Sequence, residues 1–202
     1  MLSIITGGVE MRLVVSALLA GLLGAFPSGY VFTKLIGAGD IRRLGSGNVG
    51  GVNTFKSAGM LPGLLTLLCD FGKGALAVYL AGVLAGPGAG PLLALFCVIL
   101  GHNYNPFLGF QGGKGLAAGL GGAVVLSPPV AAIMLLIVAL AALLLRDANT
   151  GAGIGVAALP VVFWFLYRDW LWILGGVAVA GLIILKHRHD FQAYRAGRRQ
   201  LF

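Results

Sequence analysis

Three short polar segments interrupt a very apolar chain, and their residue types suit the binding of anions. Residues 45–55 read GSGNVGGVNTF, residues 70–74 read DFGKG, and residues 101–115 read GHNYNPFLGFQGGKG. Glycine allows backbone conformations with positive φ, in which successive N–H groups turn toward one point and bind an anion. The glycines, hydroxyls, amides and cations of these segments therefore predict a site for negatively charged ligands.

The first segment is flanked by cations, with Arg42 and Arg43 before it and Lys56 at its end. Side-chain donors are interleaved with glycines along the segment, as expected of an anion-binding loop. The alternative is a flexible connection between two helices. The candidate ligands in this segment are Gly45, Ser46, Gly47, Asn48, Gly50, Asn53 and Lys56.

The second segment places Asp70 three residues before Lys73 within an apolar run. On a helix this spacing puts both side chains on one face, where their charges neutralise each other. Ionisable residues at membrane depth usually face the interior of a helix bundle. Two interpretations remain open for this pair, a structural ion pair and a direct contact with substrate.

The third segment places His102 at the end of one predicted helix and Lys114 at the start of the next. A helix N-terminus offers unpaired N–H groups and the positive end of the helix dipole, so an anion there also meets the lysine ammonium. A nucleotide-hydrolysing P-loop is not expected, because that motif requires Ser or Thr after its lysine. The candidate ligands here are His102, Gly112, Gly113, Lys114 and Gly115.

The C-terminal segment, residues 186–199, reads KHRHDFQAYRAGRR, and most of its cations are typical of a surface helix on anionic lipid. His187 is the exception, because it follows the last apolar run directly and faces the other polar segments. His187 and His189 lie two residues apart in a basic segment, which is not the ligand spacing of a metal site. We therefore expect no metal, and a chemistry that binds and polarises anions without a protein nucleophile.

The composition of the whole chain indicates an all-α, polytopic integral membrane protein. Of its 202 residues, 58% are hydrophobic and 10% are charged, whereas soluble domains have about a quarter charged residues. A spanning helix needs ~20 apolar residues, and the sequence predicts about seven transmembrane helices, two of them short or half-length, in one domain over residues 1–202. Because the third and fourth are short, five spans with two re-entrant segments are an alternative. The candidates run at about 12–32, 60–86, 90–102, 115–127, 129–146, 152–167 and 170–186.

Lysine and arginine orient the chain, because short cytoplasmic loops carry an excess of them. With seven spans and the N-terminus outside, only Arg12 and Arg168 lie outside. The polar segments then share the cytoplasmic face. The net charge of +8 suits anionic lipids and anionic substrates, and nucleic acid is not an expected partner. The inside cations are Lys34, Arg42, Arg43, Lys56, Lys114, Arg146, Lys186, Arg188, Arg195, Arg198 and Arg199.

Taken together, the segments resemble the motifs of the bacterial membrane acyl-phosphate:glycerol-3-phosphate acyltransferase family. GSGNVGGVNTFK is similar to its first motif, DFGKG to its second, and GHNYNPFLGFQGGKG to its third, while His187-Arg188 and Gly197 match its tail. The resemblance covers residues 45–197. The chain departs from the family pattern at Val52, Lys56, Gln111 and Asp190, where threonine, arginine, lysine and asparagine are usual, and the proline Pro106 is shifted by one place.

The resemblance implies transfer of a fatty acyl group from acyl phosphate to the 1-hydroxyl of sn-glycerol 3-phosphate. The products are lysophosphatidate and phosphate, in the first acylation step of phospholipid synthesis at the bacterial cell inner membrane. It implies no cofactor, and partners limited to the two substrates and membrane lipid, with no required protein partner. The catalytic residues it implies are Ser46, Asn48, Lys114 and His187, and it adds Thr150 and Asp190 to the substrate-binding candidates above.

Two other classes of function remain as alternatives. The same loops would serve a membrane transporter for a phosphorylated small metabolite, which needs polar positions along a path to the outer face. A lipid-binding scaffold without chemistry is the third possibility. The polar residues cluster on one face, which favours the enzyme.

Overall fold

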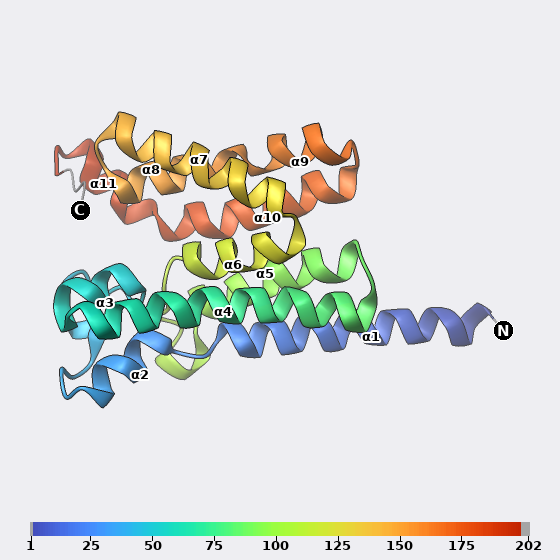
Figure 1. Ribbon diagram of the computed structural model, residues 1–202, viewed down its shortest axis with the longest axis horizontal. Coiled ribbons are helices and arrows are strands. Elements are labelled where there is room, and N and C mark those ends of the chain that lie inside the picture. Colours follow the sequence, from blue (N-terminus) through green and yellow to red (C-terminus); the bar gives the residue numbers. More distant parts are fainter. Residues whose placement is uncertain (1, 199–202) are drawn as a thin grey trace. The chain divides into compact units, whose positions relative to one another are not determined.

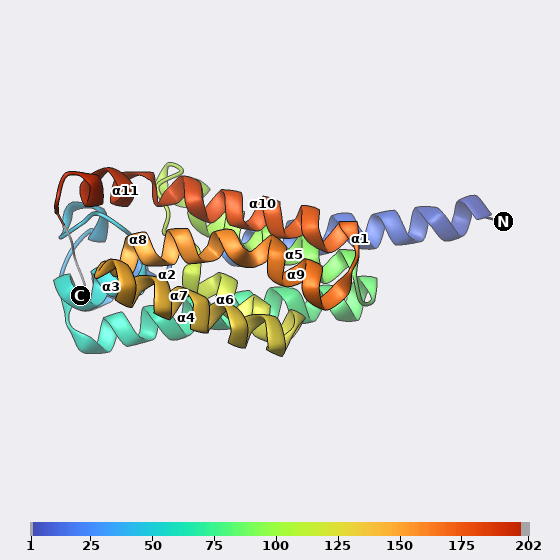
Figure 2. The ribbon, with the colours of Figure 1, turned by 90° about the horizontal axis from the view of Figure 1, so that it is seen from above.

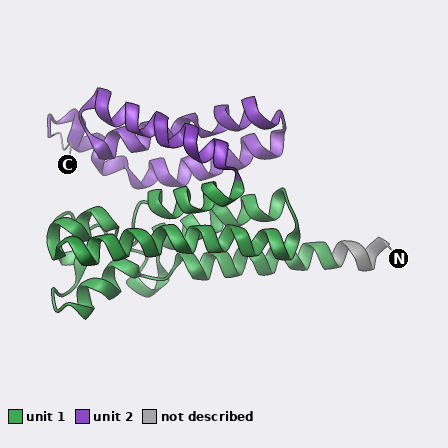
Figure 3. Cartoon of the chain, in the orientation of Figure 1, with its two compact units in different colours: residues 1–126 green, residues 127–202 purple. Residues whose placement is uncertain are grey.

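The computed structural model describes residues 2–198, with side chains from Gly8 onward, and within that range every regular element is a helix (Figure 1). The all-α prediction is therefore confirmed. Arg199, one of the predicted inside cations, lies outside the described residues. The helices fall into two compact units, residues 1–126 and 127–202, and each unit is described by itself (Figure 3).

In the first unit, the other helices pack around α4, the longest helix of the unit. α4 packs against α1, α3, α5 and α6, while α1 also packs along α5. Two 3₁₀ turns, Ile41–Arg43 and Pro106–Leu108, lie in the loops that carry the predicted site. The helices are α1 (Leu2–Gly24), α2 (Ser28–Leu35), α3 (Gly51–Ala58), α4 (Met60–Ala85), α5 (Ala89–Asn103) and α6 (Leu116–Leu126).

Glycines let the helices of the first unit approach closely. A Cβ at Gly74 of α4 would collide with the backbone of Ala118 in α6, and one at Gly101 of α5 would collide with the backbone of Gly21 in α1. In a bilayer, lipid tails are as apolar as leucine, so helices associate through such close van der Waals packing. At these two crossings, glycine is therefore required for the close packing of the helices.

The second unit is a smaller helical bundle in which α7 packs on α8 and α9 packs on α10. Asp147 caps α8 by accepting a hydrogen bond from the N–H of Thr150, 2.7 Å away. At the turn between α9 and α10, Tyr167 and Trp172 stack with ring centroids 3.9 Å apart. The helices are α7 (Pro128–Leu145), α8 (Ala148–Gly155), α9 (Leu159–Tyr167), α10 (Trp170–Lys186) and α11 (Arg188–Arg195).

The predicted count of seven membrane spans is not confirmed. Within residues 2–198, five helical segments are long and apolar enough to cross a membrane. The pair α10 and α11, bent by 55°, makes a sixth if it counts as one span (Figure 2). The predicted span at 115–127 corresponds to α6, which has 11 residues. A helix of that length is about 16 Å long and does not cross a hydrocarbon core of ~30 Å. The multi-pass prediction is confirmed, and the count of seven is not.

The predicted first span, residues 12–32, lies within the candidate span Gly8–Leu35, which has a short break between α1 and α2. α1 ends at Gly24 and α2 begins at Ser28, because Pro27 lacks an N–H and disfavours helical geometry in the residue before it. The second half of the GSGN segment also differs from the expected loop. Residues 51–58 form α3, with Gly50 as its extended N-cap residue.

Candidate functional site

The serine loop, residues 45–50, is a compact turn in which the N–H groups of Ser46, Gly47 and Asn48 have acceptors within residues 44–53. Gly45 and Gly47 have φ values of 54° and 73°, which suit glycine. The N–H of Gly47 donates to the carbonyl of Leu44 at 2.9 Å, and the N–H of Asn48 approaches the hydroxyl of Ser46 at 3.4 Å. The predicted nest of inward N–H groups is therefore mostly used to shape the turn. What it presents to a ligand is the exposed Ser46 hydroxyl, the Asn48 amide and the first turn of α3.

Asn53 holds this turn in place. Its side chain is buried, at 5% exposure. The Nδ2 group donates to the carbonyls of Asn48 at 2.8 Å and Leu44 at 3.0 Å, while the Oδ1 atom accepts from the N–H of Ser46 at 3.0 Å. We predicted a substrate ligand at this position, and the contacts give Asn53 a positioning role. Lys56, one turn further along α3, is exposed.

The lysine loop, residues 109–115, packs against the end of α5. The N–H of Gly113 donates to the carbonyl of His102 at 3.1 Å. A Cβ at Gly113 would collide with the ring of His102, and one at Gly112 would collide with the carbonyl of the same histidine. These two glycines are therefore required by the contact between the loop and α5. The half-buried Lys114 follows them directly, two residues before the start of α6.

A buried ionic cluster, the Asp70 cluster, lies behind the lysine loop and consists of Ser28, Asp70, Lys73 and His102. Asp70 Oδ1 lies 2.9 Å from Lys73 Nζ and 3.5 Å from His102 Nδ1. It also accepts a hydrogen bond of 2.6 Å from the hydroxyl of Ser28. The side chains of Asp70 and Lys73 are 1% and 6% exposed, so their charges are compensated by each other. The predicted ion pair on one face of a helix is confirmed, and it joins α2, α4 and α5.

Arg42 connects the serine loop to the lysine loop. Its Nη1 donates to the carbonyl of Leu108 at 3.1 Å, and its Nη2 donates to Asp40 Oδ2 at 2.6 Å. Asp40 also caps the 3₁₀ turn by accepting from the N–H of Arg42. The hydrogen bond with Arg42 lowers the pKa of Asp40 to about 2. Beneath this bridge, Ile41, Val49 and Leu108 form a small apolar core shared by the two loops.

In the second unit, the predicted residues come from three helices. His187 follows α10, is 0% exposed, and its Nδ1 lies 2.8 Å from the carbonyl of Ile183. Because a carbonyl only accepts, this contact assigns the proton to Nδ1 and leaves Nε2 to face other groups. Thr150 on α8 is 2% exposed, and no described residue forms a hydrogen bond with its hydroxyl. Asp190 is half-buried on α11.

Three residues that organise the site were not among the sequence candidates. Ser28 lies where the helix restarts after a proline, and a small hydroxyl residue beside such a break is the signal that points to it. Asp40 and Arg42 form the pattern Asp-x-Arg just before the GSGN segment. A helix-capping acid followed by an arginine is the corresponding signal for this turn.

The fold and the site together define an integral membrane protein that is suited to phosphorylated ligands, with two glycine loops, hydroxyls and cations in one unit. The chain belongs to the glycerol-3-phosphate acyltransferase family, because the sequence model of that family matches residues 14–197. It is 35% identical over 185 residues to the glycerol-3-phosphate acyltransferase of Carboxydothermus hydrogenoformans, covering 92% of this chain and 94% of that protein. It is 39% identical over 183 residues to that of Jannaschia sp., covering 91% and 89%.

Comparison with solved structures leads to the same family. The chain is similar to PlsY (YgiH), an integral membrane glycerol 3-phosphate acyltransferase, in its glycerol 3-phosphate form, with a TM-score of 0.86 and 29% identity over 94% of this chain and 95% of that one. The lysphosphatidic acid form of PlsY gives a TM-score of 0.79 and 27% identity, covering 93% and 94%. The membrane acyltransferase class that the motifs indicate is therefore confirmed.

Proposed function

We propose that this acyltransferase uses acyl phosphate as its donor and transfers the acyl group to the 1-hydroxyl of sn-glycerol 3-phosphate. The products are 1-acylglycerol 3-phosphate and inorganic phosphate. This choice of donor fits the residues, because an acyl phosphate is already activated and needs no cofactor and no covalent enzyme intermediate. The forms in which the related PlsY was solved, with glycerol 3-phosphate and with lysphosphatidic acid, support this acceptor and this product class.

In the proposed reaction, the oxygen of the 1-hydroxyl attacks the acyl carbon and forms the ester bond. The bond between that carbon and the phosphate oxygen breaks, and the phosphate departs with its electron pair. The hydroxyl proton passes to the phosphate, so no protein base is needed. The protein contributes orientation of the two substrates and stabilisation of the oxyanion that develops on the acyl carbonyl.

The residue roles follow from charge and donor type. Lys56, Lys114 and His187 bind the phosphate of glycerol 3-phosphate, since each can carry a positive charge and none belongs to the buried Asp70 cluster. Ser46 and Asn48 hold the acyl-phosphate end beside the reacting carbon. Supporting roles belong to the remaining candidates, which are Gly45, Gly47, Gly50, Asn53, Asp70, Lys73, His102, Gly112, Gly113, Gly115, Thr150 and Asp190.

One observation carries the proposal. The two glycine loops meet, because Arg42 beside the serine loop donates to the carbonyl of Leu108 at the entrance to the lysine loop, 3.1 Å away. This contact joins the segments that carry Ser46 and Lys114 within the first unit, which supports a common site for two phosphorylated substrates. The participation of His187, Thr150 and Asp190 from the second unit is part of the proposal. The reaction is placed at the cytoplasmic face of the bacterial cell membrane, on the strength of the charge distribution.

The test uses purified protein in lipid-like detergent with hexadecanoyl phosphate and glycerol 3-phosphate. We expect lysophosphatidate and phosphate in equal amounts, and no product when hexadecanoyl-CoA replaces the acyl phosphate. Lys114→Ala should lower kcat/KM for glycerol 3-phosphate roughly 100-fold or more, because a charge-assisted contact to phosphate is lost at the reacting centre. The matched control is Lys34→Ala, an exposed lysine of α2 outside the proposed site, which should retain full activity.

Other results would contradict the proposed donor, the transfer reaction or the role of Lys114. Product from hexadecanoyl-CoA alone would refute the proposed donor while leaving the family activity intact. Binding of glycerol 3-phosphate without any transfer, together with its passage across sealed vesicles, would favour the transporter. Full activity of Lys114→Ala would remove Lys114 from the site.

A further inference from the structure

All three tryptophans of the chain lie in residues 164–172 of the second unit, at the turn between α9 and α10 (Figure 1). We call these residues the tryptophan turn. Trp164 and Trp170 are 36% and 70% exposed, and their ring centroids lie 5.8 Å apart. Indole rings have an apolar body and a polar N–H, and they are enriched where a membrane meets water. The turn is therefore expected at the level of lipid headgroups.

The length of α10 places the tryptophan turn at one face of the membrane. α10 has 17 residues, so its length is about 26 Å, which is close to the ~30 Å thickness of the hydrocarbon core. The tryptophan turn lies at the N-terminal end of α10, and His187 follows its C-terminal end. The turn is therefore expected at the membrane face opposite to His187, away from the proposed site of acyl transfer.

An inner layer of aromatic rings fixes the shape of the turn. Tyr167 and Trp172 stack with ring centroids 3.9 Å apart, and the buried Phe163 lies edge-on to both rings, at 6.0 Å and 5.3 Å. These rings join the end of α9 to the start of α10. Asp169 caps α10 by accepting a hydrogen bond of 2.7 Å from the N–H of Leu171. The outer side chains are therefore carried by a well-packed turn.

Arg168 lies over the outer rings of the tryptophan turn. Its Cζ atom is 5.4 Å from the ring centroids of both Trp164 and Phe165, which is a cation–π distance. The side chain is exposed. Among the described residues, its guanidinium forms no ion pair and no hydrogen bond. The aromatic rings therefore hold a positive charge in place without neutralising it.

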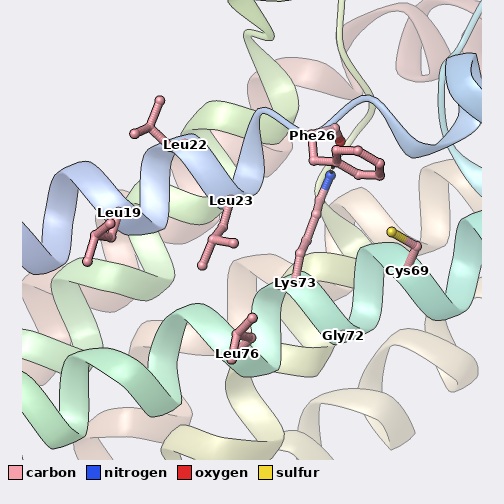
Figure 4. A pocket seen from close by; sticks show the side chains of 8 residues that line it. All are labelled: Leu19, Leu22, Leu23, Phe26, Cys69, Gly72, Lys73 and Leu76. Carbon is pink, nitrogen blue, oxygen red and sulfur yellow. Dashed lines mark hydrogen bonds between the residues drawn. The ribbon is translucent and has the colours of Figure 1, made fainter.

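The cation in the first unit's apolar pocket shows the contrast. Lys73 lines a pocket between α1 and α4, where its Nζ donates to the carbonyl of Phe26 at 2.9 Å (Figure 4). Asp70 Oδ1 lies 2.9 Å from the same Nζ and neutralises its charge. Arg168 has no such carboxylate. At headgroup depth, the fitting counter-charge is an anion that the membrane supplies.

The phosphate of an anionic glycerophospholipid fits this place. A guanidinium presents its N–H donors as a planar fork that matches two phosphate oxygens, and it stacks on aromatic faces at the same time. A zwitterionic headgroup carries its own cation next to the phosphate, so it compensates the charge of Arg168 less well. The exposed rings also need apolar contacts, which the glycerol and first methylenes of a lipid supply and dissolved phosphate does not.

We infer that the tryptophan turn binds the headgroup phosphate of an anionic glycerophospholipid, with Arg168 as the phosphate ligand. Trp164 and Trp170 contact the glycerol region of the same lipid. This site is separate from the proposed site of acyl transfer and goes beyond the proposed function. It adds no covalent step, and it anchors the α9–α10 end of the second unit at the membrane surface.

Tryptophan fluorescence tests the inference, because every tryptophan of the chain lies in the tryptophan turn. The purified full-length protein would be placed in vesicles of equal parts phosphatidylcholine and phosphatidylglycerol. The acyl chains of one lipid or of the other would carry bromine near the headgroup, where it quenches only nearby indoles. We expect bromine on phosphatidylglycerol to report an association about threefold to fivefold stronger, which is the scale of one basic residue at an anionic surface.

Arg168→Gln should remove this preference, because glutamine carries no charge. Arg146→Gln is the matched control. Arg146 and Arg168 have φ values of 51° and 53°, and each ends a helix and precedes an aspartate that caps the next helix. Arg146 lies outside the tryptophan turn, so its variant should keep the wild-type preference. Arg168→Lys should give an intermediate value, because lysine keeps the charge but lacks the planar fork.

Several outcomes would overturn the inference. Equal quenching by the two brominated lipids in the wild type would mean an aromatic anchor without a phosphate ligand. A preference that survives in Arg168→Gln, or that falls equally in Arg146→Gln, would contradict the role of Arg168. If circular dichroism shows that Arg168→Gln does not fold, the wild type and Arg168→Lys still decide, since a lysine value equal to the wild type would exclude the two-pronged contact. Quenching does not require acyl transfer, so an inactive protein would refute the proposed function alone.

Discussion

At the scale of single residues, the site depends on side chains that shape loops as much as on those that reach a ligand. Asn53 forms hydrogen bonds with three backbone groups in and just before the serine loop. Position 113 requires glycine, because the ring of His102 occupies the space that a Cβ would need. Both residues belong to motifs that suggest direct ligand contact. Their geometry shows that part of a binding motif encodes the shape of the turn that carries the ligands.

The prediction at this scale concerns Asn53→Ala. The substitution leaves the carbonyls of Leu44 and Asn48 and the N–H of Ser46 without their partner, which should lower the free energy of unfolding by about 1–3 kcal/mol. Hydrogen exchange at residues 44–48 should become faster. Val52→Ala is the control, because Val52 is exposed on the same helix and should leave the exchange unchanged. Exchange at 44–48 that stays at the wild-type rate in Asn53→Ala would contradict the positioning role.

At the scale of elements, the serine loop and the lysine loop are connected through the charged side chain of Arg42, which Asp40 holds in place. Arg42 presents a planar guanidinium to Asp40 on one side and to the carbonyl of Leu108 on the other. Lysine carries the same charge but lacks the two-pronged geometry. Arg42→Lys should therefore raise the KM for glycerol 3-phosphate about tenfold, since a hydrogen bond from a charged donor contributes about 1.5–3 kcal/mol. Its exposed neighbour Arg43 gives the control Arg43→Lys, for which steady-state kinetics should match the wild type.

The pH dependence of this bridge follows from the lowered pKa of Asp40. The carboxyl titrates at about 2 in the folded protein, below its ordinary value of 3.8. A lowered pKa means that the stabilisation is fully present above the ordinary value and is lost as the pH falls toward 2. The ratio of activities between wild type and Asp40→Asn should therefore be constant from pH 5 to 8. A ratio that changes in this range would show that Asp40 is not held as an ionised partner of Arg42.

The sequence predicts the long elements well and the short ones poorly, for physical reasons. The run at 60–86 and helix α4 (Met60–Ala85) agree within a residue, because ~20 apolar residues leave few alternatives to a spanning helix. The spacing of Asp70 and Lys73 likewise predicts their ion pair. The Arg42 bridge depends on a contact between segments far apart in the chain, and local composition carries little of that information. The break before α2, by contrast, has a local signal in Pro27.

At the scale of the whole molecule, the charge distribution predicts the orientation in the bilayer. Arg12, near the start of the first span, and Arg168, in the turn between α9 and α10, are both exposed. The other lysines and arginines outside the spans are predicted to lie on the opposite face, because cations are retained in short cytoplasmic loops. The predicted orientation puts the serine loop, the lysine loop and α11 on the cytoplasmic face.

Single cysteines measure this orientation directly. Cys69 and Cys97 lie half-buried in spans and would first be replaced by alanine. Glu10→Cys and Arg168→Cys should then react with a membrane-impermeant maleimide in intact cells, whereas Lys56→Cys should react only after lysis. Arg43→Cys provides a second cytoplasmic position on a different loop. If Lys56→Cys reacts in intact cells while Glu10→Cys stays protected, the protein has the reverse orientation. The proposed site would then face away from the cytoplasmic supply of its acceptor.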